Sequence, residues 1–284
     1  MSTRTEQQTL PNFLHIGVGK GGSTWVHEAL STHPDAYLSE AKDLYYFSRF
    51  YDRGLDWYAQ QFQSAPAGAQ VIGEVCPEYL WHPEAAARIA ADLPGIQVMA
   101  TLRDPVTRAF SAYRYDSKNG VTGLSFREAL VASPRIIDQA RYRTHLERYL
   151  TALGPEGVYV TVFDDLQTDP QAFLDGATDR LGLARHTLSE EALAAQLPAS
   201  RARSPFLARQ AKSAAEWVRR RNGAALVGKI KRSPLVNRAL YEPLTAPPEI
   251  PAADADWIRE ELTAEIEGVE NLFGLSLRDR WGWR

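Results

Sequence analysis

The chain has 284 residues, of which 44% are hydrophobic and 24% charged, and its formal net charge is −3. These values are typical of a globular protein that can bury a sizeable core. The single cysteine, Cys76, excludes an internal disulfide and fits a reducing compartment. The first ten residues are polar, and no apolar run approaches the ~20 residues of a membrane span. We therefore expect a cytoplasmic protein with no signal peptide and no membrane-spanning segment.

The stretch from Phe13 to Trp25, FLHIGVGKGGSTW, predicts a strand, a glycine-rich turn and the start of a helix. Glycines let the backbone approach an anion closely, and the N–H groups of a first helical turn lack internal partners. These groups and the helix dipole favour negative charge. The turn therefore predicts a phosphate site, although a strand, turn and helix without a ligand would show the same pattern.

The position of Lys20 indicates which phosphate chemistry this turn suits. The Walker loop of nucleoside triphosphatases reads G-x-x-x-x-G-K-[ST], and aligning its glycines on Gly17 and Gly22 puts Ser23 where the lysine belongs. A triphosphate needs a cation near its β and γ groups. A lysine earlier in the loop suits a single anionic group joined to its leaving partner by one bridging oxygen. A kinase is therefore disfavoured and remains the alternative.

Two side chains after the first predicted helix, residues 23–32, are open to two interpretations each. Lys42 stands among aromatic residues, where it either contacts a sulfate or phosphate group or simply flanks the core. Glu74 stands in the apolar strand predicted over 71–75, where an unpaired carboxylate would be costly. It is either paired with a basic residue or a general base at the carboxyl edge of a parallel sheet.

A second anion site is predicted after the strand at 96–102. Asp104 suits a helix N-cap and Pro105 a first helical residue, which leaves Arg103 at the carboxyl end of the strand. Ser111 lies on the helix that follows. An arginine at a strand edge and a hydroxyl on the next helix can share an anion.

Arg108 lies three residues before Ser111, on the same face of that helix. In the alternative interpretation of this motif, Arg103 and Arg108 form ion pairs with Asp104 and Asp116.

The order of elements favours the α/β class. Strands are predicted at 13–17, 71–75, 96–102 and 158–163, and helices lie between and after them, including residues 83–93 and 141–153. The stretch 164–170 ends the last of these strands and opens a helix that runs through Leu181. Strands that alternate with helices indicate a parallel sheet covered on both faces.

The segment from Arg201 to Arg238 holds eleven Lys or Arg against one acid, Glu216. We predict a helix over 205–221 within it. Four interpretations of this segment are open: a lid, an anion-attracting rim of the site, a surface that meets an acidic partner or membrane lipid, or a solvated basic face. A surface for nucleic acid is not favoured, because the rest of the chain is acidic and would repel the negatively charged nucleic-acid backbone. A connector at 243–251 and a helix at 254–273 follow, and the last four residues are expected to dock on the body.

Three motifs together resemble the signature set of sulfotransferases that use 3′-phosphoadenosine 5′-phosphosulfate (PAPS). They are Lys20 to Trp25, Gly73 to Tyr79 and Arg103 to Tyr113. Further stretches are similar to the branch with heparan sulfate N- and 3-O-sulfotransferases and related bacterial enzymes: 44–47, 54–58 and 142–149. The resemblance covers residues 12–183 and implies a P-loop-like, three-layer α/β fold.

The resemblance also implies roles for individual residues. Lys20 would stabilise the bridging oxygen, Glu74 would be the general base, and Arg103 and Ser111 would hold the 3′-phosphate. The 5′-phosphosulfate would lie in a cradle formed by Gly21, Gly22, Ser23, Thr24 and Trp25. The family's late basic loop has no clean match, and Arg203 or Arg201 is the candidate for it. The family often has threonine at Ser23 and serine or threonine at Cys76.

We therefore predict one sulfotransferase domain over residues 1–284, with a core at 12–183 and a helical C-terminal part at 200–284 that could form a lid. It would move a sulfuryl group from PAPS, without a metal ion, to a hydroxyl or less readily an amine of a small metabolite or saccharide. The alternatives are a P-loop kinase and a non-catalytic nucleotide-binding module. The sequence does not predict the acceptor or the oligomeric state.

Overall fold

The structure is a computed structural model, and it describes residues 8–189, 200–202, 210, 214, 218, 241–243 and 249–283. These residues group into two compact units. The first contains residues 8–17, 22–101 and 147–189, and the second contains residues 18–21, 102–146 and the described residues from 200 onward. The single domain expected from the sequence stays a prediction, and we describe each unit by itself.

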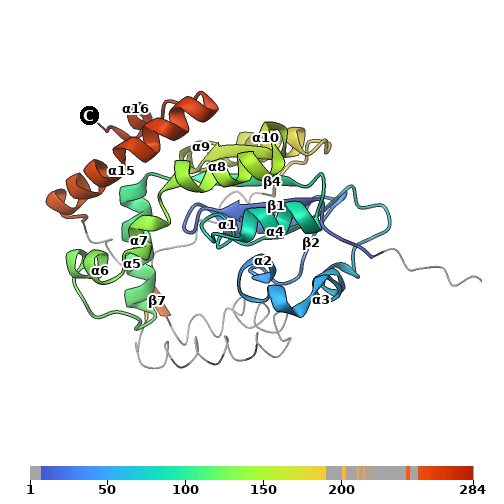
Figure 1. The fold of residues 1–284 in the computed structure, drawn as a ribbon, viewed down its shortest axis with the longest axis horizontal. Coiled ribbons are helices and arrows are strands. Elements are labelled where there is room, and N and C mark those ends of the chain that lie inside the picture. Colours follow the sequence, from blue (N-terminus) through green and yellow to red (C-terminus); the bar gives the residue numbers. More distant parts are fainter. Residues whose placement is uncertain are drawn as a thin grey trace, which may run out of the picture. The chain divides into compact units, whose positions relative to one another are not determined.

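The first unit is built on a five-stranded sheet with the order β2-β3-β1-β4-β5. Figure 1 labels β1, β2 and β4 of this sheet. Its strands are β1 (Phe13–Gly17), β2 (Ala36–Leu38), β3 (Val71–Val75), β4 (Gln97–Leu102) and β5 (Val158–Val162). β1 pairs in parallel with β3 and β4, and β2 pairs in parallel with β3. The sheet confirms the predicted α/β class and four predicted strands. The short strand β2 is an addition.

Helices and turns connect these strands. They are α1 (Ser23–Ser31), α2 (Tyr46–Arg49), α3 (Leu55–Ala59), α4 (Ala85–Asp92), the second half of α8 (Tyr142–Leu153), α9 (Phe163–Thr168) and α10 (Pro170–Arg180), with 3-10 turns η1 (Tyr51–Arg53), η2 (Gln60–Phe62) and η3 (Pro155–Gly157). The helix predicted to open within the stretch 164–170 and run through Leu181 is confirmed as α10, and the short helix α9 before it is an addition. The Asp169 carboxylate accepts the Ala172 N–H and so caps α10, and Pro170 suits its first position.

Side chains alternate between the two faces of the sheet. On one face, Phe13, Val75 and Met99 pack with buried residues of α1, α9 and α10. On the other face, Glu74 lies among buried aromatic residues from α2, α3 and the segment after β3: Tyr46, Phe47, Tyr58 and Tyr79. The β3 carboxylate is thus enclosed in an aromatic part of the core.

The second unit is mostly helical. It contains α5 (Pro105–Lys118), α6 (Phe126–Ala132), α7 (Arg135–Asp138), the first half of α8, α15 (Ala252–Phe273) and α16 (Leu277–Trp281), with strands β6 (Ser200–Ala202) and β7 (Tyr241–Pro243) in an antiparallel pair. α5 begins as predicted, because the Asp104 carboxylate accepts the N–H groups of Val106 and Thr107. Trp283, only 7% exposed, also donates its indole N–H to Asp104 (3.2 Å), so the C-terminal end docks as expected.

The basic segment and the membrane-span prediction can be judged only on the described residues. Most of the basic segment lies outside the described residues, including Arg203 and all of the predicted helix at 205–221 except residues 210, 214 and 218. In the part of the chain that is described, no helix has the length and apolar character needed to cross a membrane.

Candidate cofactor and catalytic site

The glycine-rich turn follows β1 and leads directly into α1. Gly22 is the N-cap residue of α1, with φ 88°, and offers no side chain to cap the helix. A Cβ at Gly22 would lie 2.6 Å from Leu166 Cδ2 and 3.2 Å from the Phe163 ring, so the position requires glycine. The N-terminus of α1 is thus left without a side-chain cap, as an anion site requires.

The first turn of α1 contains the three other residues predicted to surround the 5′ group. Ser23 is buried, and Thr24 and Trp25 are half-buried. The Trp25 ring lies edge-on to Phe173 of α10, with ring centroids 5.8 Å apart. The ring therefore packs on the core of the first unit, and a cofactor contact of this residue stays a prediction.

Lys20 and Arg103, one from each predicted anion motif, are in contact in the second unit through the backbone carbonyl of Lys20. Lys20 has φ 74°, a left-handed backbone that residues other than glycine rarely adopt. Arg103 Nη1 donates to the Lys20 carbonyl (2.8 Å), and Arg103 Nε donates to Thr107 Oγ1 (3.2 Å). The Tyr142 hydroxyl donates to the Arg103 carbonyl (2.8 Å). The two motifs are therefore in direct contact although 83 residues separate them in the sequence.

The ammonium group of Lys20 lies over the ring of Tyr115 on α5, with Nζ 4.5 Å from the ring centroid. A cation over an aromatic face is attracted by the ring quadrupole. Sequence reasoning missed Tyr115, because it lies two residues beyond the motif that ends at Tyr113. Its position four residues after Ser111, on the same face of α5, could have indicated it.

Arg108 differs from the expectation that it pairs with Asp104 or Asp116. It is fully buried on α5 and donates instead to the Ile136 carbonyl and to Gln139 Oε1. Burial lowers its pKa, and the nearby charge of Arg103 lowers it further. Among the described residues, no partner accepts a hydrogen bond from Arg108 Nε. Ser111, by contrast, is half-buried on the same helix, as a ligand-contacting hydroxyl requires.

Glu74 is fully buried in the first unit, and three groups donate to its carboxylate. The Tyr58 hydroxyl donates to Oε2 (2.8 Å), the Tyr79 hydroxyl lies 3.0 Å from both oxygens, and the Leu44 N–H donates to Oε1 (2.9 Å). Among the described residues, Glu74 therefore has tyrosine hydroxyls and one backbone N–H as partners and not the basic side chain considered for it.

Burial raises the pKa of Glu74 to about 7, and the hydrogen bonds from Tyr58, Tyr79 and Leu44 limit this rise. Such a pKa suits a general base near neutral pH. A direct base must also reach the proton that it accepts, and an enclosed carboxylate does not. Whether Glu74 is the base therefore stays a prediction.

A second carboxylate, Asp43, lies at the same end of β3, because its N–H donates to the Val75 carbonyl (3.0 Å). Its side chain is 19% exposed and lies 3.2 Å from Lys42 Nζ. Asp43 and Tyr45 both have left-handed backbones, with φ 64° and 59°. Strained residues cluster at functional sites. Sequence reasoning considered Lys42 and missed Asp43, although an acid directly after that lysine was the available signal.

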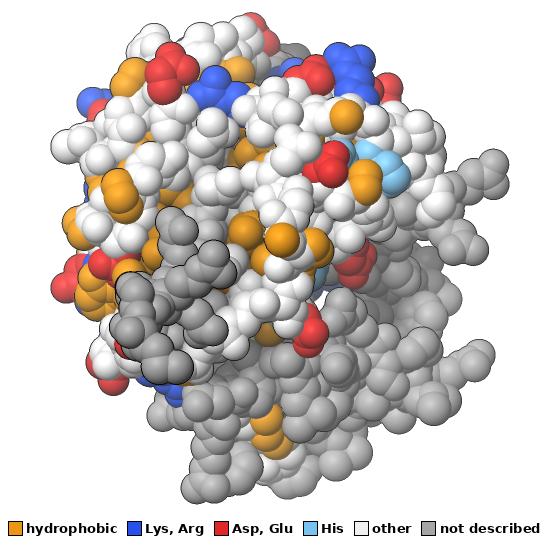
Figure 2. All heavy atoms as spheres, turned by 90° about the vertical axis from the view of Figure 1, so that its right-hand side faces the viewer, with side chains coloured by type: hydrophobic (Ala, Val, Ile, Leu, Met, Phe, Trp, Pro, Cys, Tyr) orange, Lys and Arg blue, Asp and Glu red, His pale blue; other side chains and the backbone are white. Residues whose placement is uncertain are grey.

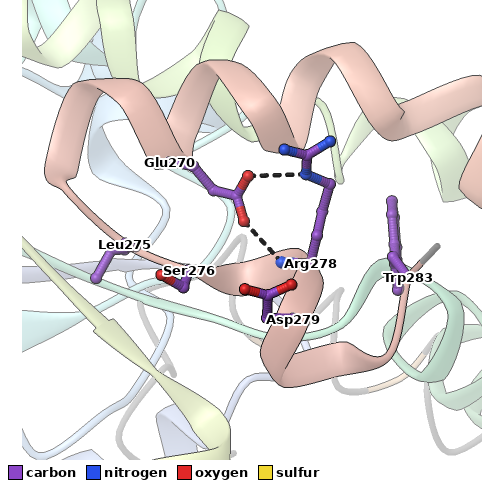
Figure 3. Close-up of a pocket in the computed structure, with 6 residues that line it drawn as sticks. All are labelled: Glu270, Leu275, Ser276, Arg278, Asp279 and Trp283. Atoms are coloured by element: carbon purple, nitrogen blue, oxygen red, sulfur yellow. Dashed lines mark hydrogen bonds and ion pairs between the residues drawn. The ribbon is translucent and has the colours of Figure 1, made fainter.

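A hollow of about 380 Å³ between α15 and α16 lies elsewhere in the second unit (Figure 3). In it the carboxylate of Glu270 accepts the N–H of Arg278 (2.7 Å) and its Nε (2.8 Å). Glu267 also pairs with Arg278. None of the predicted site residues lines this hollow, and its arginine already has carboxylate partners, so it gives no support for an anion site.

Two wider observations concern charge and metals. The face drawn in Figure 2 carries acidic and basic side chains side by side, with hydrophobic side chains in small groups between them. Within the described ranges, no group of three or more His, Cys, Asp or Glu residues is arranged to hold a metal ion.

A model described as the sulfotransferase family matches residues 47–187. Over these residues the chain is similar to the sulfotransferase family. A solved sulfotransferase from Alicyclobacillus acidocaldarius is 26% identical, with a TM-score of 0.60 over 81% of this chain and 99% of that chain. The P-loop-like fold expected from the sequence is thereby confirmed.

Two human members of the sulfotransferase family are similar in sequence. Heparan sulfate glucosamine 3-O-sulfotransferase 3B1 is 33% identical over 190 residues, which are 62% of this chain and 47% of that protein. Bifunctional heparan sulfate N-deacetylase/N-sulfotransferase 3 is 29% identical over 206 residues, which are 65% of this chain and 24% of that protein. The match therefore spans less than half the length of either relative.

Proposed function

We propose that this chain is a cytoplasmic enzyme that transfers a sulfuryl group from PAPS to a hydroxyl, in preference to an amine, of a small metabolite or saccharide. The observation that carries the proposal is the contact between Arg103 and Lys20. A donor with one anionic group at its 5′ end and another at its 3′ end needs two cationic motifs that meet. The match of residues 47–187 to the sulfotransferase family model supports the reaction class.

The residues of the second unit fit the donor chemically. Lys20 Nζ would stabilise the bridging oxygen as negative charge develops on it, and Arg103 and Ser111 would hold the 3′-phosphate. Lysine and arginine supply the positive charge, so transfer needs positioning and charge stabilisation rather than a metal ion. The donor supplies the sulfuryl group, whose bond to the bridging oxygen breaks as the acceptor oxygen bonds to sulfur.

Of the two carboxylates at the end of β3, we propose Asp43 as the group that takes the proton from the acceptor. The sequence prediction assigns this role to Glu74. The burial of Glu74 favours a structural role instead, because through the Leu44 N–H it would hold the strained segment that carries Asp43. Asp43 is partly exposed, so an acceptor hydroxyl can reach it. Glu74 remains the alternative base.

The saccharide side of the proposal is supported by the two human relatives, whose names refer to heparan sulfate and, in one case, its glucosamine. We therefore place oligosaccharides with amino sugars first among acceptors. Incubation with PAPS labelled in sulfur, followed by mass spectrometry, would identify a sulfated product and its position. Transfer only to small phenols or alcohols would contradict the saccharide preference and leave the reaction class intact.

Thermal denaturation with adenosine 3′,5′-bisphosphate or with Mg²⁺-ATP tests the cofactor class without an acceptor. A ligand at 100 times its dissociation constant stabilises the folded state by about 2.7 kcal/mol. We expect the bisphosphate to raise the melting temperature, and Arg103→Ala to abolish most of this rise. Stabilisation by Mg²⁺-ATP alone would contradict the proposal and favour a P-loop kinase, which Ser23 in the Walker lysine position disfavours.

A further inference from the structure

We propose that Arg103 has a second role, as a positioning residue that holds Lys20 in its working conformation and so couples the two ends of the donor site. This inference rests on the proposed function for its catalytic meaning. Its structural part rests on contacts within the second unit alone. In the sequence-based interpretation, Arg103 does no more than bind the 3′-phosphate.

Arg103 is itself held by contacts within the second unit. Its Nε donates to Thr107 Oγ1 (3.2 Å), its carbonyl accepts from the Tyr142 hydroxyl (2.8 Å), and its Nη1 reaches the Lys20 carbonyl (2.8 Å). A guanidinium has five N–H donors in a rigid fork. One guanidinium can therefore bond to more than one group at once, such as the Lys20 carbonyl and Thr107.

The peptide group between Lys20 and Gly21 is held on both sides. A trans peptide is planar, so its C=O and N–H point in opposite directions. The C=O accepts from Arg103, and the Gly21 N–H donates to the Val18 carbonyl (3.1 Å). With φ at 74°, Lys20 has a backbone conformation that costs free energy and needs outside contacts to persist. Arg103 supplies such a contact.

The side-chain end of Lys20 is also directed by the second unit, since its ammonium lies over the Tyr115 ring. Arg103 thus contacts the backbone of Lys20, and Tyr115 on α5 contacts its charged ammonium group. Loss of the Arg103 guanidinium would release the backbone contact. The orientation of the whole loop would then change, even for a ligand that has no 3′-phosphate.

Amide hydrogen exchange of ligand-free protein tests the structural part, with the Gly21 N–H as the reporter. We expect Arg103→Ala to speed its exchange about tenfold, the order of one charge-assisted hydrogen bond. Ser111→Ala is the matched control, because Ser111 shares the predicted 3′-phosphate role and should leave Gly21 exchange unchanged. Wild-type exchange at Gly21 in folded Arg103→Ala would overturn the inference. If that variant does not fold, Arg103→Lys replaces it, with the same expectation.

A pair of ligands tests the functional part. Adenosine 5′-monophosphate lacks the 3′-phosphate that adenosine 3′,5′-bisphosphate carries. If Arg103 only binds the 3′-phosphate, Arg103→Ala weakens binding of the bisphosphate and leaves binding of the monophosphate unchanged. That result would show that the inference is wrong. If Arg103 also orders the loop, the variant weakens both ligands, the monophosphate about tenfold, whereas Ser111→Ala weakens the bisphosphate alone. Absence of bisphosphate binding to the unmodified protein would contradict the proposed function. The exchange experiment would still show whether Arg103 holds the backbone of Lys20.

Discussion

The hydroxyl of Tyr79 lies 3.0 Å from each carboxylate oxygen of Glu74, so one tyrosine contacts the whole carboxylate of a fully buried glutamate. Tyr58 adds a second hydroxyl from α3. Within the part of the chain that is described, this arrangement keeps a titratable group inside an aromatic core with hydroxyl donors and no basic partner. Its consequences can be measured independently of any reaction.

Protein stability should depend on pH through Glu74. Burial raises its pKa from 4.5 to about 7 in the folded state, so the folded state holds a proton that the unfolded state releases. The free energy of unfolding should therefore fall as pH rises from about 4.5 to about 7, by on the order of 3 kcal/mol from this group. Chemical denaturation at several pH values would measure the fall, and Glu74→Gln should remove this part of it. An identical pH dependence in that variant would contradict the prediction.

Removing one hydroxyl from the Glu74 cluster should destabilise the fold. Tyr58→Phe deletes a hydrogen bond to a buried carboxylate and should lower the free energy of unfolding by about 1.5–3 kcal/mol at neutral pH. Tyr51→Phe is the matched control, because Tyr51 donates to the partly exposed carboxylate of Asp92 at 3.3 Å. Tyr51→Phe should lower the free energy of unfolding by less than Tyr58→Phe does. An equal decrease in both variants would show that burial does not strengthen the contribution of the Tyr58 hydrogen bond.

Asp43 and Glu74 should respond differently in a transfer assay. If Asp43 takes the proton, Asp43→Asn should lower kcat about 100-fold or more and leave bisphosphate affinity close to that of the parent. Glu74→Gln should lower kcat less and should also increase amide exchange at Leu44, whose N–H it accepts. The reverse order of kcat losses, with normal Leu44 exchange in Glu74→Gln, would return the role of base to Glu74.

Gly22 should tolerate no side chain. An added Cβ would lie 2.6 Å from Leu166, and φ is 88°, so Gly22→Ala combines a clash with backbone strain and should cost about 2 kcal/mol or more. Gly274→Ala isolates the strain, because Gly274 has φ 65° and no neighbour within 4 Å of an added Cβ. Thermal denaturation should show a clearly larger loss at Gly22. Equal losses would mean that Leu166 moves aside at no cost.

The sequence predicted the main strands because their apolar runs are short and bounded by glycine or proline. It predicted the start of α5 because Asp104 and Pro105 are strong local signals. It missed β2, whose three residues form a strand only by pairing with β3. It also missed α9, a short helix that begins directly after β5.

The site was predictable where one residue type implies one chemistry, and not where the environment decides. Lys20 and Arg103 could be named separately, yet their contact depends on the fold. The burial of Glu74 and the partial exposure of Asp43 depend on how α3 and the segment after β3 close over the sheet. No local pattern encodes such a closure.

Arg108 carries a positive charge into the interior of the second unit, held by the Ile136 carbonyl and the Gln139 amide oxygen and close enough to Arg103 to lower its own pKa. The field of this buried cation therefore exists before any ligand arrives, and no rearrangement is needed to create it. A protein arranged in this way should attract small oxyanions in general. Phosphate or sulfate buffers would then act as competitors, so handling in a weakly coordinating buffer such as Tris chloride is the natural choice for measuring nucleotide affinity.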